Sequence, residues 1–185
     1  MAKRVCPYWV GYWLSNPLRR LIHNPEKILA PYVTGGMTVL DIGSAMGFFT
    51  LPLAQLVGPQ GKVICVDVQE KMFEVLQNRA RKAQLAERII TRKCEPTSLG
   101  LADFYGQIDF ALAFAVVHEV RDISNFFGEV SKLLRPNACC LVAEPKGHVS
   151  APDFEKTLVS AKHHGLTVVG SPKIIWSRTA LLRKN

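Results

Sequence analysis

The chain has 185 residues, of which 48% are hydrophobic and 21% are charged, and it carries a formal net charge of +8 at pH 7. This length and composition are typical of one globular domain, and no apolar run reaches the roughly 18 residues that a membrane-spanning helix needs. The positive charge would suit nucleic acid, but most basic residues are spread along the chain without interleaved aromatic residues, so a nucleic-acid partner is disfavoured.

Residues 1–34 are predicted to form an N-terminal segment that folds over a pocket as a lid, ahead of a main domain at residues 35–185. Trp9 and Trp13 are four residues apart, so one helical face would carry both. A helix is predicted over residues 24–33, with proline in its favoured first turn. The aromatic residues of the segment would equally suit packing against a sheet edge or, together with its basic residues, peripheral contact with a membrane.

From residue 37 onwards, apolar strands alternate with amphipathic helices. Strands are predicted at 37–42, 62–68, 88–92, 108–115 and 139–143, and helices at 48–57, 70–85, 123–134 and about 154–161. Two last strands, at 166–170 and about 173–183, have no helix between them and should pair antiparallel. The pattern predicts a doubly wound α/β fold, with a mostly parallel sheet of seven strands, helices on both faces and an antiparallel C-terminal hairpin.

A glycine-containing loop follows the first strand in V-L-D-I-G-S-A-M-G-F-F-T, residues 39–50. Gly43 and Gly47 allow the backbone to approach a ligand beyond the carboxyl end of the strand. Asp41 would repel a pyrophosphate but suits a cation, and the G-x-G-x-x-G fingerprint is absent. Asp67 ends the second strand, where a carboxylate can accept both hydroxyls of a ribose. Taken singly, the two aspartates could form a turn and a helix cap; taken together, they favour S-adenosylmethionine (SAM).

Four segments resemble, in order, the motifs of class I SAM-dependent methyltransferases: V-L-D-I-G-S-A-M-G, V-I-C-V-D, I-D-F-A-L-A-F-A-V-V-H-E-V and L-L-R-P-N-A-C-C-L-V-A-E-P. The sequence is most similar to the ubiquinone/menaquinone-biosynthesis type over about residues 35–145. The resemblance implies a Rossmann-like fold and methyl transfer from SAM to a small-molecule acceptor. A nucleic-acid methyltransferase is disfavoured because A-F-A-V replaces an N-P-P-Y-like tetrad. A non-catalytic SAM-binding module is disfavoured because both aspartates are retained.

The resemblance also assigns residues to the cofactor, although the sequence departs from the family pattern in places. It implies contacts to SAM from Asp41, Gly43, Ser44, Ala45, Gly47, Asp67, Val68, Glu95 and Phe114. Ala45 stands where a second glycine is most frequent, and Asn137 replaces a glycine in a turn that still allows positive φ. Glu95 takes the place of the acidic residue that meets adenine, but the next residue, Pro96, has no N–H to donate. Either that contact is lost, or the register shifts so that Cys94 precedes a donor at Glu95.

A general base is needed only if the acceptor must lose a proton, and three residues after the fourth and fifth strands are candidates: His118, Glu119 and Glu144. His118 titrates in the appropriate range but would equally suit packing of its loop. The stretch A-E-P-K-G-H-V, residues 143–149, gathers a carboxylate, an ammonium and an imidazole. It predicts recognition of a polar or anionic acceptor, with a salt-bridged loop as the alternative.

Five cysteines without a C-x-x-C pair predict neither disulfides nor a metal site. We therefore expect a reduced protein in the cytoplasm. The identity of the acceptor, the accepting atom and the oligomeric state are left open by the sequence.

Overall fold

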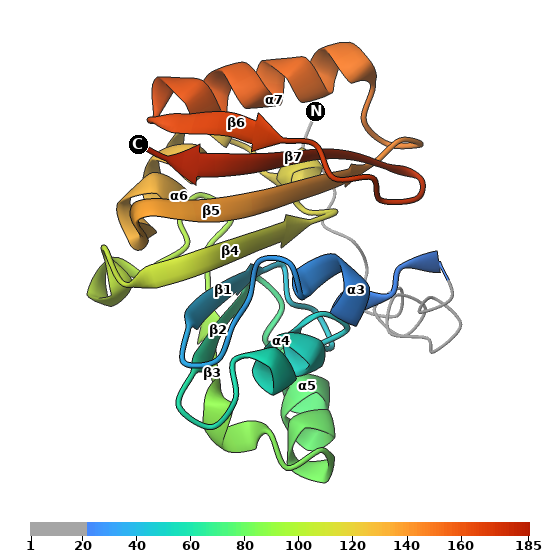
Figure 1. The fold of residues 1–185 in the computed structure, drawn as a ribbon, viewed down its shortest axis with the longest axis vertical. Coiled ribbons are helices and arrows are strands. Elements are labelled where there is room, and N and C mark those ends of the chain that lie inside the picture. The colour runs from blue at the N-terminus through green and yellow to red at the C-terminus, as the bar shows by residue number, and fades with distance from the viewer. Residues whose placement is uncertain (1–21) are drawn as a thin grey trace.

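The structure, a computed structural model, describes residues 22–185 and is built on one seven-stranded sheet (Figure 1). Its strands are β1 (Thr38–Ile42), β2 (Lys62–Asp67), β3 (Ile89–Lys93), β4 (Ile108–Phe114), β5 (Leu134–Pro145), β6 (Leu166–Gly170) and β7 (Ser177–Lys184). They are arranged in the order β3-β2-β1-β4-β5-β7-β6. The first five strands are parallel, whereas β7 runs antiparallel to both β5 and β6. The predicted doubly wound sheet with an antiparallel C-terminal hairpin is therefore confirmed.

The helices are α3 (Pro25–Leu29), α4 (Thr50–Leu56), α5 (Glu70–Lys82), α6 (Ile123–Leu133) and α7 (Ala151–His163), with short 3-10 turns η1 (Ala86–Arg88), η2 (Ala102–Phe104) and η3 (Val117–Glu119). Three of the helices, α3, α6 and α7, begin where the sequence supplies a capping side chain. The side chains of Asn24, Asp122 and Ser150 each accept a backbone N–H in the first turn of α3, α6 and α7. Such contacts satisfy donors that the helix itself leaves unpaired.

The sheet separates two apolar cores because alternate residues of each strand point to opposite faces. Val39 packs with the helices α3, α4 and α5, and its neighbour Leu40 packs with α6 and α7. Both side chains are fully buried. Figure 1 shows α3, α4 and α5 grouped beside β1–β3 and α7 lying along β6 and β7. Among the described residues no helix is both long enough and apolar enough to cross a membrane.

Several predicted elements differ in length from the structure; the last strand, for example, begins at Ser177 and not at about residue 173. The helix predicted over 24–33 ends at Leu29, since Pro31 has no N–H to continue the helical hydrogen bonds. The fifth strand begins at Leu134, five residues earlier than predicted, because Leu134 already pairs with Ile108 across an irregularity in the register. Asn137, within this irregular stretch, has the positive φ that its sequence context predicts, 65°. The aromatic part of the predicted lid, residues 1–21, lies outside the described residues.

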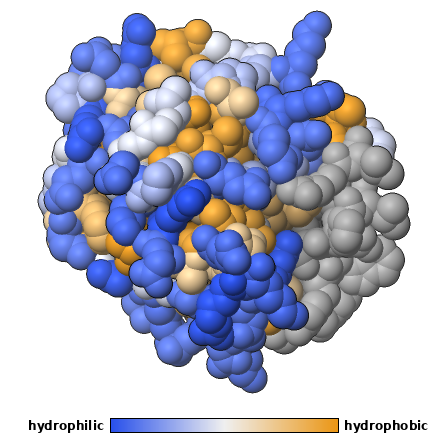
Figure 2. All heavy atoms as spheres, turned by 60° about the horizontal axis from the view of Figure 1, so that its bottom comes forward, coloured by the Kyte–Doolittle hydropathy of each residue, from blue (hydrophilic) through white to orange (hydrophobic). Residues whose placement is uncertain are grey.

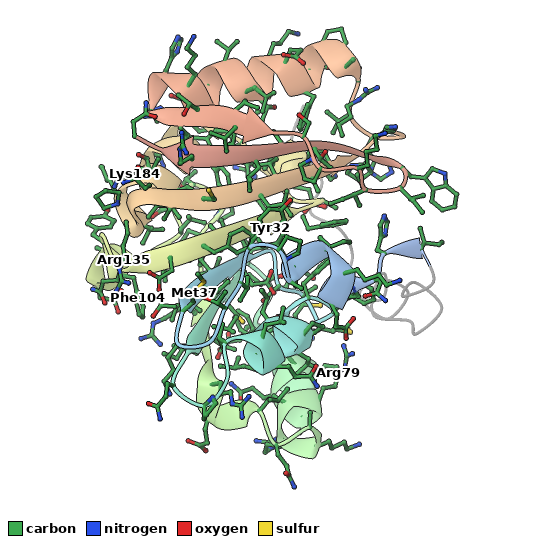
Figure 3. All side chains as sticks on the ribbon, in the orientation of Figure 1. Tyr32, Met37, Arg79, Phe104, Arg135 and Lys184 are labelled. Carbon is green, nitrogen blue, oxygen red and sulfur yellow. The ribbon has the colours of Figure 1, made fainter. Side chains whose placement is uncertain are left out.

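The amino ends of β4 and β5 and the carboxyl end of β7 are tied together at one edge of the sheet, where Figure 3 shows Arg135 and Lys184. Arg135 forms an ion pair with Asp109. Lys184 donates from Nζ to the carbonyl oxygen of Leu134 at 2.8 Å. These contacts leave the carboxyl ends of β1–β5, at the other edge, as the place where loops can shape a site.

We predict that Gly47→Ala destabilises the fold more than Gly58→Ala does. Both residues have positive φ, +86° and +67°, so each substitution carries a backbone cost of about 1–2 kcal/mol. A Cβ at Gly47 would also lie 2.4 Å from Cδ1 of Leu76, whereas a Cβ at Gly58 would have no atom within 4 Å. Urea denaturation should show the larger loss of unfolding free energy for Gly47→Ala. Equal losses would mean that Leu76 moves aside without cost.

Candidate functional site

A pocket opens beyond the carboxyl ends of β1, β2, β3 and β4. Most of its lining comes from four segments, 41–49, 66–69, 94–99 and 114–121, with Met72, Phe126 and Glu129 adding side chains from α5 and α6. Loops after four neighbouring strands meet here because parallel strands end at the same edge of a sheet. Figure 2 shows that hydrophilic residues cover much of the surface, with apolar residues visible between them.

The glycine loop after β1 is held against β2 and the loop after β4. The N–H groups of Gly43 and Ser44 both donate to the carbonyl oxygen of Val66, at 2.9 and 3.2 Å. A Cβ at Gly43 would lie 2.8 Å from Cγ2 of Val116, so glycine is required by close packing as well as by its φ of 73°. Arg79 of α5, which Figure 3 labels, donates from Nη1 to the carbonyl oxygen of Met46 in the same loop.

Asp41 is buried at the end of β1, with its side chain 3% exposed. The hydroxyl of Thr50 donates to its Oδ2 at 2.6 Å. Burial raises the pKa of Asp41 to about 7, the Thr50 hydrogen bond lowers it, and the negative charge of Asp67 raises it. A cation in the pocket would relieve this cost, because it would replace the lost solvation of the carboxylate.

Asp67 ends β2 and lines the same pocket. The N–H of Ala45 donates to Oδ2 at 3.0 Å, and the N–H of Gln69 donates to Oδ1 at 2.9 Å. Burial raises the pKa of Asp67, and the backbone hydrogen bonds from Gln69, Ala45 and Val68 lower it. These backbone donors occupy part of the acceptor capacity of the carboxylate, and the remaining lone pairs can accept from a ligand hydroxyl.

The segment after β3 lacks the backbone donor that the sequence left in question. The N–H of Cys94 donates to the carbonyl oxygen of Asp67 at 3.1 Å, and the N–H of Glu95 donates to Ser98 at 3.0 Å. Pro96 has no N–H. Neither of the two registers considered from the sequence thus supplies a free backbone donor at Glu95 or Pro96, although Cys94, Glu95 and Pro96 all line the pocket.

Glu129 of α6 fixes the shape of this segment, and the sequence analysis did not identify it. Its Oε1 accepts from the hydroxyl of Ser98 at 2.7 Å, and its Oε2 accepts from the N–H of Leu99 at 2.6 Å. Arg79, which contacts Met46 across 33 residues, and Thr50, which contacts Asp41, were also missed. Arg121, exposed and in the pocket lining, was missed as well. Thr50 ends the quoted glycine-loop stretch, whereas Arg79, Arg121 and Glu129 lie outside the motif segments that indicate the cofactor site.

The three candidate bases occupy different places. Glu119 lines the pocket, but His118 and Glu144 are not among the lining residues. Glu144 is 1% exposed and lies beneath the loop after β4. Its Oε1 accepts from the N–H groups of Val116 and Val117, both at 3.0 Å. Its Oε2 meets the backbone N–H and the Nδ1 of His118, at 3.1 and 2.5 Å. Glu144 therefore stabilises the loop after β4, and its contact with His118 orients the His118 ring outside the pocket lining.

The stretch 143–149 does not converge on the pocket as its composition suggested. Neither Lys146 nor His148 is among the lining residues. The N–H of Lys146 donates to the carbonyl oxygen of Trp176 at 2.9 Å. The ring of His148 instead packs edge-on against His118, with 5.5 Å between centroids. Of the alternative, a salt-bridged loop, the structure has the contact between the Glu144 carboxylate and the His118 ring.

The predicted cofactor contacts are mostly brought together. Asp41, Gly43, Ser44, Ala45, Asp67, Val68, Glu95 and Phe114 all line the pocket. Gly47 is not in the lining but closes the glycine loop, its N–H donating to the carbonyl oxygen of Ser44 at 2.9 Å. Over residues 22–185 no group of three or more His, Cys, Asp or Glu side chains is arranged to hold a metal ion.

The sequence matches the family described as methyltransferase domain over residues 34–171. The chain belongs to this methyltransferase domain family. The fold is shared with a SAM-dependent methyltransferase from Aquifex aeolicus, at a TM-score of 0.86 and 24% identity, over 98% of this chain and 100% of that one. It is shared also with geranyl diphosphate methyltransferase, solved in complex with SAM, at a TM-score of 0.71 and 16% identity over 90% and 86% of the two chains.

Curated relatives are longer than this methyltransferase domain. The arsenite methyltransferase of Halobacterium salinarum is 30% identical over 130 residues, which is 70% of this chain and 32% of the relative. The ubiquinone/menaquinone biosynthesis C-methyltransferase of Hahella chejuensis is 30% identical over 113 residues, which is 60% of this chain and 44% of the relative. The chain thus spans about a third to less than half of the length of these relatives. The resemblance read from the motifs is confirmed at the level of the family.

We predict that Glu144→Gln destabilises the methyltransferase domain by about 2 kcal/mol, because an amide cannot accept all the donors that converge on the carboxylate. Glu155→Gln is the matched control, since Glu155 is exposed on α7, and it should change the unfolding free energy by less than about 0.5 kcal/mol. Chemical denaturation of the ligand-free protein measures both. A fully stable Glu144→Gln variant would contradict the structural role.

We predict that Asp41 makes the ligand-free protein less stable as pH rises. Its pKa is about 7 in the folded protein against an ordinary value of 3.8. Between pH 3.8 and about pH 7, the Asp41 carboxyl is protonated in the folded state but ionised in the unfolded state. The free energy of unfolding therefore falls as pH rises through this range, and the loss is complete above about pH 7. Asp41→Asn should narrow the difference in unfolding free energy between pH 5 and pH 8. The exposed Asp103→Asn should retain the wild-type difference, and an unchanged profile in Asp41→Asn would refute the assignment.

Proposed function

We propose that the chain is a SAM-dependent methyltransferase that transfers a methyl group to a small-molecule acceptor, with residues 35–185 as the catalytic domain. The observation that carries the proposal is the placement of Asp41 and Asp67 in one pocket, on either side of a glycine loop. One carboxylate suits a cationic group, and the other suits the hydroxyls of a ribose. Family membership supports the same reaction.

The pocket residues fit SAM in three respects. Ser44 Oγ is buried in the pocket wall and, among the described residues, has no hydrogen-bond partner apart from the neighbouring Cys65 thiol. Side chains at Gly43 and Gly47 would collide with Val116 and Leu76, so glycine at both positions lets the loop keep the shape that lines the pocket. The carboxylates supply negative charge, which would repel a phosphate group.

In this arrangement SAM supplies an electrophilic methyl group on a sulfonium, and the protein supplies position. Asp41 would balance the positive charge of the amino-acid end, and Asp67 would accept from the ribose hydroxyls. Val68 and the segment held by Glu129 would enclose the adenine. Ordering of both reactants accounts for much of the acceleration in a direct displacement.

We propose that the acceptor lies against the aromatic side chains of the pocket, which favours an acceptor with an apolar or aromatic body. Phe49 packs against Phe48, with 5.1 Å between centroids, and against Phe114 at 4.5 Å. Glu119 and Arg121 are charged lining residues in the segment after β4. Glu119 is the base that we propose where the acceptor must lose a proton, and His118 would act only after leaving Glu144.

The names of relatives are compatible with several acceptors, since they include arsenite, ubiquinone/menaquinone-pathway and catechol methyltransferases. We propose a cytoplasmic location on the cysteine pattern, and Cys65, Cys94, Cys139 and Cys140 are free thiols. Peripheral membrane contact through the N-terminal aromatic residues remains a proposal from the sequence.

Calorimetric titration with SAM and S-adenosylhomocysteine tests the proposal. We predict binding of both, weakened at least tenfold in Asp67→Asn, because two charge-assisted hydrogen bonds to the ribose become weaker. Asp103→Asn removes an exposed carboxylate outside the pocket and should bind as the wild type does.

The absence of binding by folded wild-type protein, checked to be free of carried-over cofactor, would overturn the proposal. Equal affinity of Asp67→Asn and wild type would leave a SAM-binding protein but remove the assigned site. Binding as predicted would justify a screen of acceptors with labelled methyl groups.

A further inference from the structure

The loop between β6 and β7, residues 171–176, exposes two adjacent large hydrophobic side chains. Ile175 is 56% exposed and Trp176 is 66% exposed, the two highest values for such side chains among the described residues. Figure 1 shows this loop projecting at the end of the hairpin. Adjacent exposed isoleucine and tryptophan side chains are costly in water and indicate a binding surface.

The backbone holds Trp176 in this position. Its φ is 57°, a left-handed conformation that is unfavourable for a bulky side chain. The N–H of Lys146 donates to the carbonyl oxygen of Trp176 at 2.9 Å, and the N–H of Ser177 donates to Ile174 at 3.1 Å. Strain that the surrounding contacts maintain at an exposed aromatic residue supports a functional reason for its exposure.

The exposed loop lies at the same edge of the sheet as the pocket. Ser177, the first residue of β7, pairs with Pro145, the last residue of β5. His23 Nε2 donates to the carbonyl oxygen of Ile175 at 2.9 Å, and the His23 ring packs edge-on against Phe114, with 5.3 Å between centroids. Since Phe114 lines the pocket, one side chain separates the loop from the pocket wall.

The charges around the loop are positive. Lys173 within the loop and Lys146 beside it are both exposed. No acidic residue occurs between positions 171 and 185. Basic residues beside a tryptophan and an isoleucine are the combination that binds an anionic membrane surface, with the aromatic ring at the level of the headgroups.

We propose that Ile175 and Trp176, flanked by Lys146 and Lys173, dock the protein on an anionic membrane surface. The apolar side chains enter the interface, and the lysines select negatively charged lipid. Docking by this loop turns the pocket edge of the sheet towards the membrane. That an apolar acceptor then reaches the pocket from the bilayer rests on the proposed function; the docking itself does not.

Cosedimentation with lipid vesicles tests the docking. The wild type should bind vesicles of phosphatidylcholine with phosphatidylglycerol and bind phosphatidylcholine alone more weakly. Ile175→Ser/Trp176→Asn should lose about tenfold or more of the partition coefficient, since the buried apolar area is lost. Asparagine is chosen because it tolerates positive φ. Lys146→Glu/Lys173→Glu should lose the preference for phosphatidylglycerol.

Tyr105→Ser is the matched control, because Tyr105 is 46% exposed and precedes β4 at the opposite edge of the sheet. It should bind vesicles as the wild type does. Failure of the wild type to bind either vesicle would overturn the proposal, as would equal binding by Ile175→Ser/Trp176→Asn. A concentration-dependent dimer that only this double variant abolishes, without vesicle binding, would assign the loop to a second copy instead.

Two further measurements separate this proposal from the proposed function. Thermal melting shows that the loop variants are folded, and calorimetry with SAM shows whether their pocket is intact. Vesicle binding without SAM binding would support the docking surface and overturn the proposed function. SAM binding without vesicle binding would support the proposed function and overturn the docking surface.

Discussion

The hydrogen bonds from Gly43 and Ser44 to the carbonyl oxygen of Val66 are the contacts on which the pocket depends. They join the turn after β1 to the end of β2, so the two parallel strands present their last side chains to the same space. Ala45, in that turn, then donates to Asp67, and Asp41 lies just before it. Two negatively charged groups are thereby fixed in relation to one glycine loop. Burial of the two carboxyl groups raises both pKa values, and a cation and hydroxyl groups in the pocket would offset the cost of burying their charges.

The buried carboxylates of this protein differ in how much of their hydrogen-bonding capacity is used. Four donors converge on Glu144, three from the backbone and one from a histidine ring. Backbone N–H groups of Ala45 and Gln69, with a smaller contribution from Val68, reach Asp67, and one hydroxyl reaches Asp41. A carboxylate saturated by protein donors organises its own loop, whereas one with remaining lone pairs facing a pocket can bind a ligand. This difference supports a structural role for Glu144 and the proposed binding roles of Asp41 and Asp67, although all three are acidic residues near strand ends.

The antiparallel addition of β7 to β5 has a consequence for the surface. Because β7 starts beside the carboxyl end of β5, its preceding loop lies at the ligand edge of the sheet. Ile175, which precedes the exposed Trp176, and the pocket residue Phe114 are linked through His23. A docking surface at the pocket edge would place the pocket close to the source of a lipophilic acceptor. The opposite edge is held by the Asp109–Arg135 ion pair and by the contact of Lys184 with Leu134.

The sequence by itself determined the alternation of strands and helices, the family, and the positions of Asp41, Gly43 and Asp67. These depend on local periodicity and on turn chemistry next to a strand end, which a short segment encodes. Only the tertiary structure decided that His118 and Glu144 meet each other across 26 residues, outside the lining. It also decided that Arg79 supports Met46 across 33 residues and that Glu129 holds the segment after β3. Such contacts are set by strand register and helix packing, which bring distant residues together by burying apolar surface and leave no local pattern in the chain.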